Sequence, residues 1–170
     1  SNLKPLSLKE QYMSKIAFQD CYIQSLSHCY GCGKNNPEGH QLKSYWLDNY
    51  EGSKTIAHFT PKPYHTAIPG FVYGGLLASL IDCHGTGSAA AIVHYKNDLA
   101  IGSDPSVRFV TAALNINYLA PTPINKQLEL IGEFRHIKDN KVIVDITVSA
   151  NNVMCAKGEV IAVKMPATFL

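Results

Sequence analysis

Residues 69–82 read Pro-Gly-Phe-Val-Tyr-Gly-Gly-Leu-Leu-Ala-Ser-Leu-Ile-Asp, and this stretch decides the fold. It opens the least polar run of the chain, which continues well beyond Asp82. A helix that is apolar nearly all round is buried in a protein core. We therefore predict a buried central helix over about residues 71–93, with Gly74 and Gly75 at its start and Asp82 in its middle.

Strand patterns lie on both sides of this helix. The longer ones are separated by short turns such as Asp139–Asn140 and Asn151–Asn152. Short turns between long strands indicate antiparallel hairpins. The expected strands cover residues 41–47, 54–59, 109–119, 127–138, 141–150 and 153–164. This order predicts an α+β fold in which one antiparallel β-sheet wraps around a long central helix.

The N-terminal part has a different pattern. Apolar residues recur every three to five positions over about residues 6–27, which predicts a helix. A shift to Gly, Cys, Asn and Pro then predicts a loop over residues 28–40. We therefore divide the chain into an N-terminal helical extension, residues 1–27, and a main domain, residues 28–170.

The composition excludes several classes of protein. The chain has 170 residues, 46% of them apolar, which suits a single domain with a sizeable core. Its net charge of +2 comes without clustered Lys or Arg, so no nucleic acid partner is expected. No uninterrupted apolar run reaches about 18 residues, so no membrane span is expected. The five cysteines, an odd number, argue against a disulfide scaffold and predict a cytoplasmic location.

Two features of the helix point to chemistry. An ionised carboxylate buried without a partner is very costly, so Asp82 is either paired structurally or opens onto a cavity as a functional group. Gly74 and Gly75 lie where backbone N–H groups have no helical partner, and such a terminus can hold the oxyanion formed when a carbonyl group is attacked. The alternative is that the two glycines only permit a tight turn and close packing.

The spacing of these features predicts a dimer. Gly74 and Asp82 are eight residues apart, which corresponds to about 12 Å along a helix. Both groups therefore act on one carbonyl only if they come from different subunits. An antiparallel helix of a second copy would bring its Asp82 to this Gly74, which predicts a twofold dimer with two sites at the interface.

Three motifs carry a resemblance to a known family. Residues 69–82 resemble the PaaI-like branch of the hotdog-fold acyl-CoA thioesterase superfamily, in which a His-Gly-Gly places its His nine residues before a catalytic Asp or Glu. Tyr73 stands at that His position here. Residues 111–118, Thr-Ala-Ala-Leu-Asn-Ile-Asn-Tyr, are similar to the strand after the central helix, above all in the carboxyl-terminal modulator thioesterases. Residues 29–39 resemble the loop before the first strand, so the resemblance covers about residues 28–165.

The resemblance implies a hotdog fold and the hydrolysis of an acyl-CoA thioester to a free acid and coenzyme A. Asp82 matches the catalytic carboxylate, a nucleophile or a general base for water. Gly74 matches the residue whose backbone N–H polarises the thioester carbonyl, and Gly75 completes the turn. Thr111 matches a hydroxyl residue that positions the water or the carboxylate. The implied partners are acyl-CoA and further copies of the chain, as a homodimer or a dimer of dimers, with no metal or redox cofactor.

Three further residues are assigned to substrate binding together with Gly75. His65 lies where relatives have a polar loop residue before the Pro-Gly. Tyr73 replaces the family His and offers an O–H donor on a longer side chain. Asn115 shares a strand face with Asn117, and that face meets solvent, a partner or the ligand.

Two other functions are weighed against hydrolysis. The Tyr73 replacement motivates a non-catalytic hotdog protein that binds an acyl ligand. An acyl-CoA hydratase on the same fold ranks below both, because the motif in which a nearby His pairs with the catalytic Asp is not found around Asp82.

The cysteines near these motifs are read as thiols. A four-coordinate zinc site needs two ligands beyond Cys29-x-x-Cys32, and no second Cys pair follows, so we expect reduced or structural thiols without a metal. Cys83 and His84 adjoin Asp82 but point in different directions on a helix, so they form no dyad. His84 is expected to be a packing or interface residue.

Overall fold

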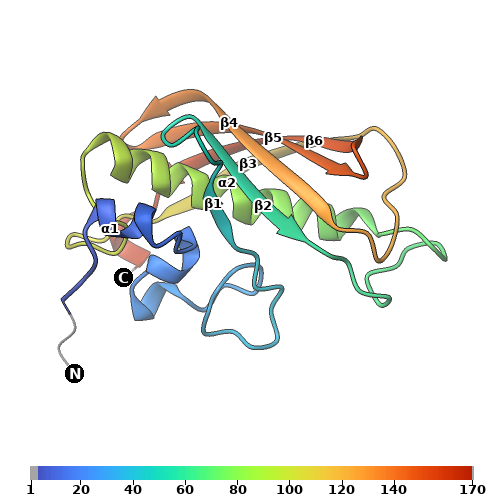
Figure 1. Ribbon diagram of the computed structural model, residues 1–170, viewed down its shortest axis with the longest axis horizontal. Coiled ribbons are helices and arrows are strands. Elements are labelled where there is room, and N and C mark those ends of the chain that lie inside the picture. Colours follow the sequence, from blue (N-terminus) through green and yellow to red (C-terminus); the bar gives the residue numbers. More distant parts are fainter. Residues whose placement is uncertain (1–3, 170) are drawn as a thin grey trace.

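The computed structural model describes residues 4–169. Figure 1 shows one curved sheet wrapped along the long helix α2. The six strands have the order β1-β2-β4-β5-β6-β3, and every neighbouring pair is antiparallel. The strands are β1 (Ser44–Trp46), β2 (Lys54–Phe59), β3 (Phe109–Tyr118), β4 (Leu128–Lys138), β5 (Lys141–Ala150) and β6 (Val153–Lys164). The helices are α1 (Leu8–Met13) and α2 (Gly74–Lys96), with short 3-10 helices η1 (Phe18–Cys21), η2 (Gln24–Leu26) and η3 (Ala167–Phe169). The predicted α+β hotdog fold is confirmed.

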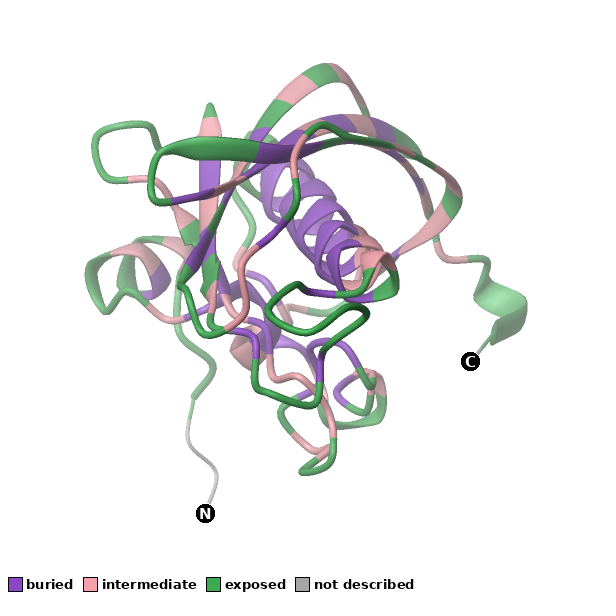
Figure 2. Cartoon of the chain, turned by 90° about the vertical axis from the view of Figure 1, so that its right-hand side faces the viewer, coloured by how far each residue is buried: buried purple, intermediate pink, exposed green. Residues whose placement is uncertain are grey.

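Helix α2 forms the centre of the core. Sixteen of its 23 residues are buried, and Figure 2 shows it enclosed beneath the sheet. Glycines allow this close approach, because a Cβ at Gly85 would lie 2.5 Å from Val160 Cγ2, and one at Gly158 would lie 2.5 Å from Ile81 Cγ2. By length and composition alone α2 would also pass as a membrane span, but 83% of that window is buried inside the fold, as in any core helix.

The predicted strand boundaries hold best at β2, which covers residues 54–59 as predicted, and at the last hairpin. β5 and β6 begin and end where predicted. Asn151 and Asn152 between them both have positive φ, 50° and 62°, which is what a two-residue hairpin turn requires. By contrast, α2 begins three residues later than predicted, because Phe71 and Val72 pair in isolated β-bridges instead.

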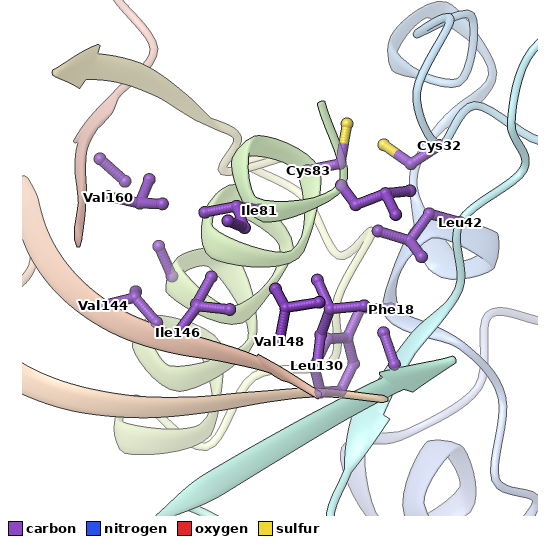
Figure 3. Packing of buried hydrophobic residues seen from close by; sticks show 14 of the residues in the cluster. Phe18, Cys32, Leu42, Ile81, Cys83, Leu130, Val144, Ile146, Val148 and Val160 are labelled. Carbon is purple, nitrogen blue, oxygen red and sulfur yellow. The ribbon is translucent and has the colours of Figure 1, made fainter. Parts of the chain in front are cut away.

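The prediction of one continuous helix over residues 6–27 is wrong. α1 begins with a capping box between Ser7 and Glu10 and ends after six residues. Lys15 then adopts a positive φ of 48°, which interrupts the helical path, and η1 and η2 follow. Apolar residues of this segment are buried in the main core, where Phe18 joins the cluster that contains Ile81 (Figure 3). The domain boundary after residue 27 stays a prediction.

A buried polar network ties the N-terminal segment and the first two strands to α2. His84 Nδ1 lies 2.8 Å from Ser44 Oγ, and His84 Nε2 lies 3.1 Å from Thr55 Oγ1. Gln19 donates to Ser44 Oγ at 2.9 Å, and Thr55 and Ser88 share a hydrogen bond of 2.7 Å. All five side chains are fully buried. His84 is therefore a packing histidine, one of its two predicted roles.

The burial of His84 predicts an acid-sensitive fold. Desolvation lowers the pKa of His84 to about 4 from an ordinary 6.5, so the folded state favours the neutral ring. Its contribution to the free energy of unfolding is complete above pH 6.5 and is lost as pH falls toward 4, by up to about 3 kcal/mol. Urea unfolding across this range should show a weaker pH dependence for His84→Asn than for the wild type. The exposed His28→Asn is the control, and equal pH slopes for all three proteins would contradict this role.

Candidate active site

Asp82 lies on the part of α2 that the rest of the chain leaves partly uncovered. Gly75, Ala78, Ser79 and Asp82 form one stripe three or four residues apart, and none of them is buried. The Thr111 hydroxyl on the edge strand β3 donates a hydrogen bond to Asp82 Oδ1. A bulge in β3 follows directly after Thr111, and bulges re-aim side chains in this way. The structure thus brings together two of the predicted catalytic residues.

The start of α2 presents two free backbone donors. Tyr73 at the N-cap is extended, with ψ 144°, and gives the helix no side-chain cap. Within residues 4–169, the N–H groups of Gly74 and Gly75 donate to no other group. Helix dipoles make such N–H groups the positive end of the helix. They can therefore hold the oxygen of a carbonyl group.

Tyr118, the last residue of β3, covers this helix start. Its hydroxyl donates to the Gly74 carbonyl at 2.8 Å. A Cβ at Gly74 would lie 3.1 Å from the Tyr118 ring, and a Cβ at Gly75 would lie 2.4 Å from Tyr73 Cε2. The two glycines therefore leave room for two tyrosine rings. Tyr118 was not assigned from the sequence, where its only signal is its place at the end of the Thr111 motif.

A pocket of about 580 Å³ opens beside the free donors. Val72, Leu77 and Pro121 give it apolar walls, and Gly74 and Tyr118 border it. Ligand pockets typically have this size and combine apolar walls with a few polar groups. An apolar chain attached to a carbonyl suits this arrangement.

Gly74 and Asp82 remain separate within one chain. Both lie on the continuous helix α2, eight residues apart, which corresponds to about 12 Å along its axis. One chain therefore holds two half-sites, the donors at the helix start and the carboxylate near its middle.

His65 supports the loop before α2. Its backbone carbonyl accepts from Tyr73 N–H at 3.0 Å. Its ring is buried, and Nδ1 accepts from Lys62 N–H at 2.9 Å. Burial and the neighbouring His40, whose ring centroid is 5.4 Å away, lower the pKa of His65. The structure therefore links His65 to Tyr73 through the backbone, with the imidazole packed in an aromatic cluster.

Asn115 is not brought to these half-sites. Its side chain donates to Glu159 at 3.0 Å, and Arg135 binds the same Glu159. The residue after Glu159, Val160, faces α2, so Glu159 and Asn115 lie on the sheet face turned away from the helix. This places Asn115 among surface charges, apart from Asp82.

A cluster of three thiols adjoins the site through Cys83, the neighbour of Asp82. Hydrogen bonds from the Cys32 and Cys83 thiols, and from the backbone N–H groups of Cys32 and Gly31, hold the pKa of Cys29 far below its usual range. The hydrogen bond to Cys29 raises the pKa of Cys32 to about 11 and also raises the pKa of Cys83. Cys83 was missed as a member of this cluster because it lies 54 residues from Cys29.

Comparison with known families gives one matching family model. It is described as the thioesterase superfamily and matches residues 69–157, just over half of the chain. The matched segment contains α2 and both half-sites, from the loop before Tyr73 through Thr111 and Tyr118.

Three individual proteins are similar to the chain. A thioesterase superfamily protein of known structure from Shewanella loihica is 53% identical, over 87% of this chain and 99% of that one, with a TM-score of 0.64. The protein smu.793 from Streptococcus mutans, solved bound to acetyl CoA, is 19% identical over 69% of this chain and 85% of that one, with a TM-score of 0.53, a likeness of fold alone. Acyl-coenzyme A thioesterase THEM4 from Bos taurus is 25% identical over 100 residues, which are 59% of this chain but span only 35% of that protein.

Proposed function

The chain belongs to the thioesterase superfamily, and from this membership and the site geometry we propose that it hydrolyses an acyl-CoA thioester to a free acid and coenzyme A. The observation that carries the proposal is the combination of two free N–H groups at a pocket with apolar and polar walls and a carboxylate held by a hydroxyl group. The acetyl CoA bound to the Streptococcus mutans protein of the same fold supports coenzyme A as the carrier.

The helix start supplies the electrophilic half of the reaction. The thioester carbonyl oxygen accepts from the Gly74 N–H, with the acyl chain against the apolar walls of the pocket, Val72, Leu77 and Pro121. Negative charge develops on this oxygen when the carbonyl carbon is attacked. Fixed N–H donors at the positive end of a helix stabilise that charge without reorganising, which is often the largest single contribution to catalysis.

Asp82 supplies the other half. Its carboxylate removes a proton from a water molecule as the water oxygen attacks the carbonyl carbon. The carbon–sulfur bond then breaks, and the proton passes to the departing thiolate. The Thr111 hydroxyl holds one carboxylate oxygen, so it orients the other toward the water. In the alternative route, the Asp82 carboxylate attacks the carbonyl carbon itself and the thiolate leaves, and water then hydrolyses the resulting mixed anhydride; this route needs the same placement of Asp82. Neither route needs a metal or redox cofactor.

The two halves act together in a homodimer. Each chain keeps them about 12 Å apart, so the Asp82 of one subunit serves the Gly74 of another. Two unpartnered surfaces support this arrangement. β3 is an edge strand that pairs only with β6 within the described chain, and a long open edge is normally covered. Beside β3, the stripe of Gly75, Ala78, Ser79 and Asp82 consists mostly of small residues, which leaves room for the helix α2 of a second subunit.

The role of Asp82 predicts a large loss of activity on neutralisation. Asp82→Asn should lower kcat/KM by at least about 100-fold, because general-base catalysis contributes on this scale. Thr111→Val should cause a smaller loss, and Asp48→Asn, at an exposed ion pair with Lys15, should cause none. Release of free thiol from a panel of acyl-CoAs measures this. Unchanged activity in Asp82→Asn would refute the mechanism, and a wild type that binds but cleaves no acyl-CoA would favour the non-catalytic ligand-binding function that Tyr73 suggests.

The role of the Gly74 N–H can be tested with a substitution that removes this hydrogen and a matched one that keeps it. Proline is well tolerated at the first position of a helix, and Tyr73 before it already has the extended backbone that proline demands. Gly74→Pro should lower kcat by about 100-fold or more, the usual effect of losing one oxyanion donor. Gly74→Ala adds the same Cβ beside Tyr118 but keeps the N–H, so its loss should be much smaller. Equal losses in the two variants would show that the N–H is not used.

A further inference from the structure

Three cysteines from two distant parts of the chain converge beside α2. Cys29 and Cys32 lie in the loop before β1, and Cys83 lies on α2. The Sγ atoms of Cys29 and Cys83 are 3.8 Å apart, and all three Sγ atoms lie within 4.8 Å of one another. Figure 3 shows Cys32 and Cys83 facing each other between the loop and the helix. Cys32 and Cys83 are buried, and Cys29 is half-buried.

The separation of the sulfurs suits a tetrahedral metal ion. Zinc binds thiolate at about 2.3 Å, so two sulfurs on one tetrahedral zinc lie about 3.8 Å apart. The Cys29–Cys83 distance has this value. A disulfide would use two of the three thiols and leave the third in the same buried space, whereas one zinc ion would use all three.

The loop is shaped around the sulfurs by its glycines. Gly33 N–H donates to the Cys29 carbonyl at 2.7 Å, which closes a tight turn over the Cys29-x-x-Cys32 segment. A Cβ at Gly31 would lie 2.3 Å from Cys83 Sγ, and one at Gly33 would lie 2.4 Å from Cys29 N. A side chain at Gly31 would push the loop away from Cys83, and one at Gly33 would collide with the loop's own backbone at residues 27–29.

A neighbouring cation balances the charge that an occupied site would carry. Three thiolates on one zinc ion carry a net charge of −1. Arg108 lies near enough to all three cysteines for their charges to act on it, and its guanidinium stacks 4.5 Å from the Tyr22 ring. The charge of Arg108 therefore neutralises that of the occupied site.

We propose that Cys29, Cys32 and Cys83 bind one zinc ion that fixes the loop before β1 to α2, one residue beyond Asp82. The three thiols lose their protons on binding. Within the described part of the chain no further His, Cys, Asp or Glu joins this cluster, so water or an added thiol takes the fourth position. This proposal differs from the prediction, made from the sequence, that these cysteines are thiols without a metal. It does not depend on the proposed hydrolysis.

Metal analysis of the untagged protein tests the site. Protein purified without chelator from zinc-supplemented cells should contain about one zinc per chain. Cys29→Ser should lose it, and Cys21→Ser, a half-buried cysteine outside the cluster, should keep it. Cobalt(II) added to the metal-free wild type should give the intense absorption of tetrahedral thiolate coordination. Zinc should also raise the thermal midpoint of the wild type and of Cys21→Ser only.

Three results would overturn the proposal. One is a metal-free wild type that also gives no thiolate–cobalt absorption. Another is equal zinc in Cys29→Ser and Cys21→Ser, which would mean adventitious binding elsewhere. The third is a disulfide among the three cysteines in protein purified and alkylated without oxygen. Because the wild-type stoichiometry and the cobalt spectrum need no variant, poor folding of Cys29→Ser leaves the test valid.

Discussion

The burial of α2 against a single curved sheet is the constraint on which the rest of the structure depends. Gly85 on the helix and Gly158 on β6 let their backbones approach, and Ile81 and Val160 fill the contact. Because α2 is buried, each polar side chain on it needs a hydrogen-bond partner or access to solvent. His84 is satisfied by hydroxyl groups from the first two strands. Within residues 4–169 the Asp82 carboxylate is hydrogen-bonded only by the Thr111 hydroxyl, and Asp82 stays half-exposed.

The same rigid helix also determines the organisation of the site. The first turn of α2 begins with the free N–H groups of Gly74 and Gly75 beside the pocket, and the Asp82 carboxylate lies about two turns further along the helix. Because α2 is buried over most of its length, the distance between these N–H groups and the carboxylate is fixed. It is too long for both to act on the same carbonyl group. Assembly of two copies is therefore part of the proposed chemistry, and the open edge of β3 beside Thr111 is the surface left for it.

Local patterns predicted much of this structure, and long-range contacts account for the errors. The β5 and β6 boundaries followed from asparagine turns whose backbone preference is local. Residues 6–27 were predicted as one helix because apolar spacing cannot distinguish a helix from short turns pinned to a core by Phe18. Alternation placed Asn115 and Asn117 on one strand face, but only the pairing with β6 shows that this face is turned away from α2. Cys83 lies 54 residues from Cys29, so only the packing of the loop on α2 shows that it belongs with the other two cysteines.

Mixing two inactive variants tests the shared site most directly. In a heterodimer of Asp82→Asn with Gly74→Pro, one interface site combines the intact Asp82 of one subunit with the intact Gly74 of the other. Unfolding and refolding the two variants together at equal concentration should therefore restore about a quarter of wild-type activity, since about half of the dimers are mixed and each has one intact site of two. If the mixture stays as inactive as either variant while mixed dimers are present, Asp82 and Gly74 do not act across subunits.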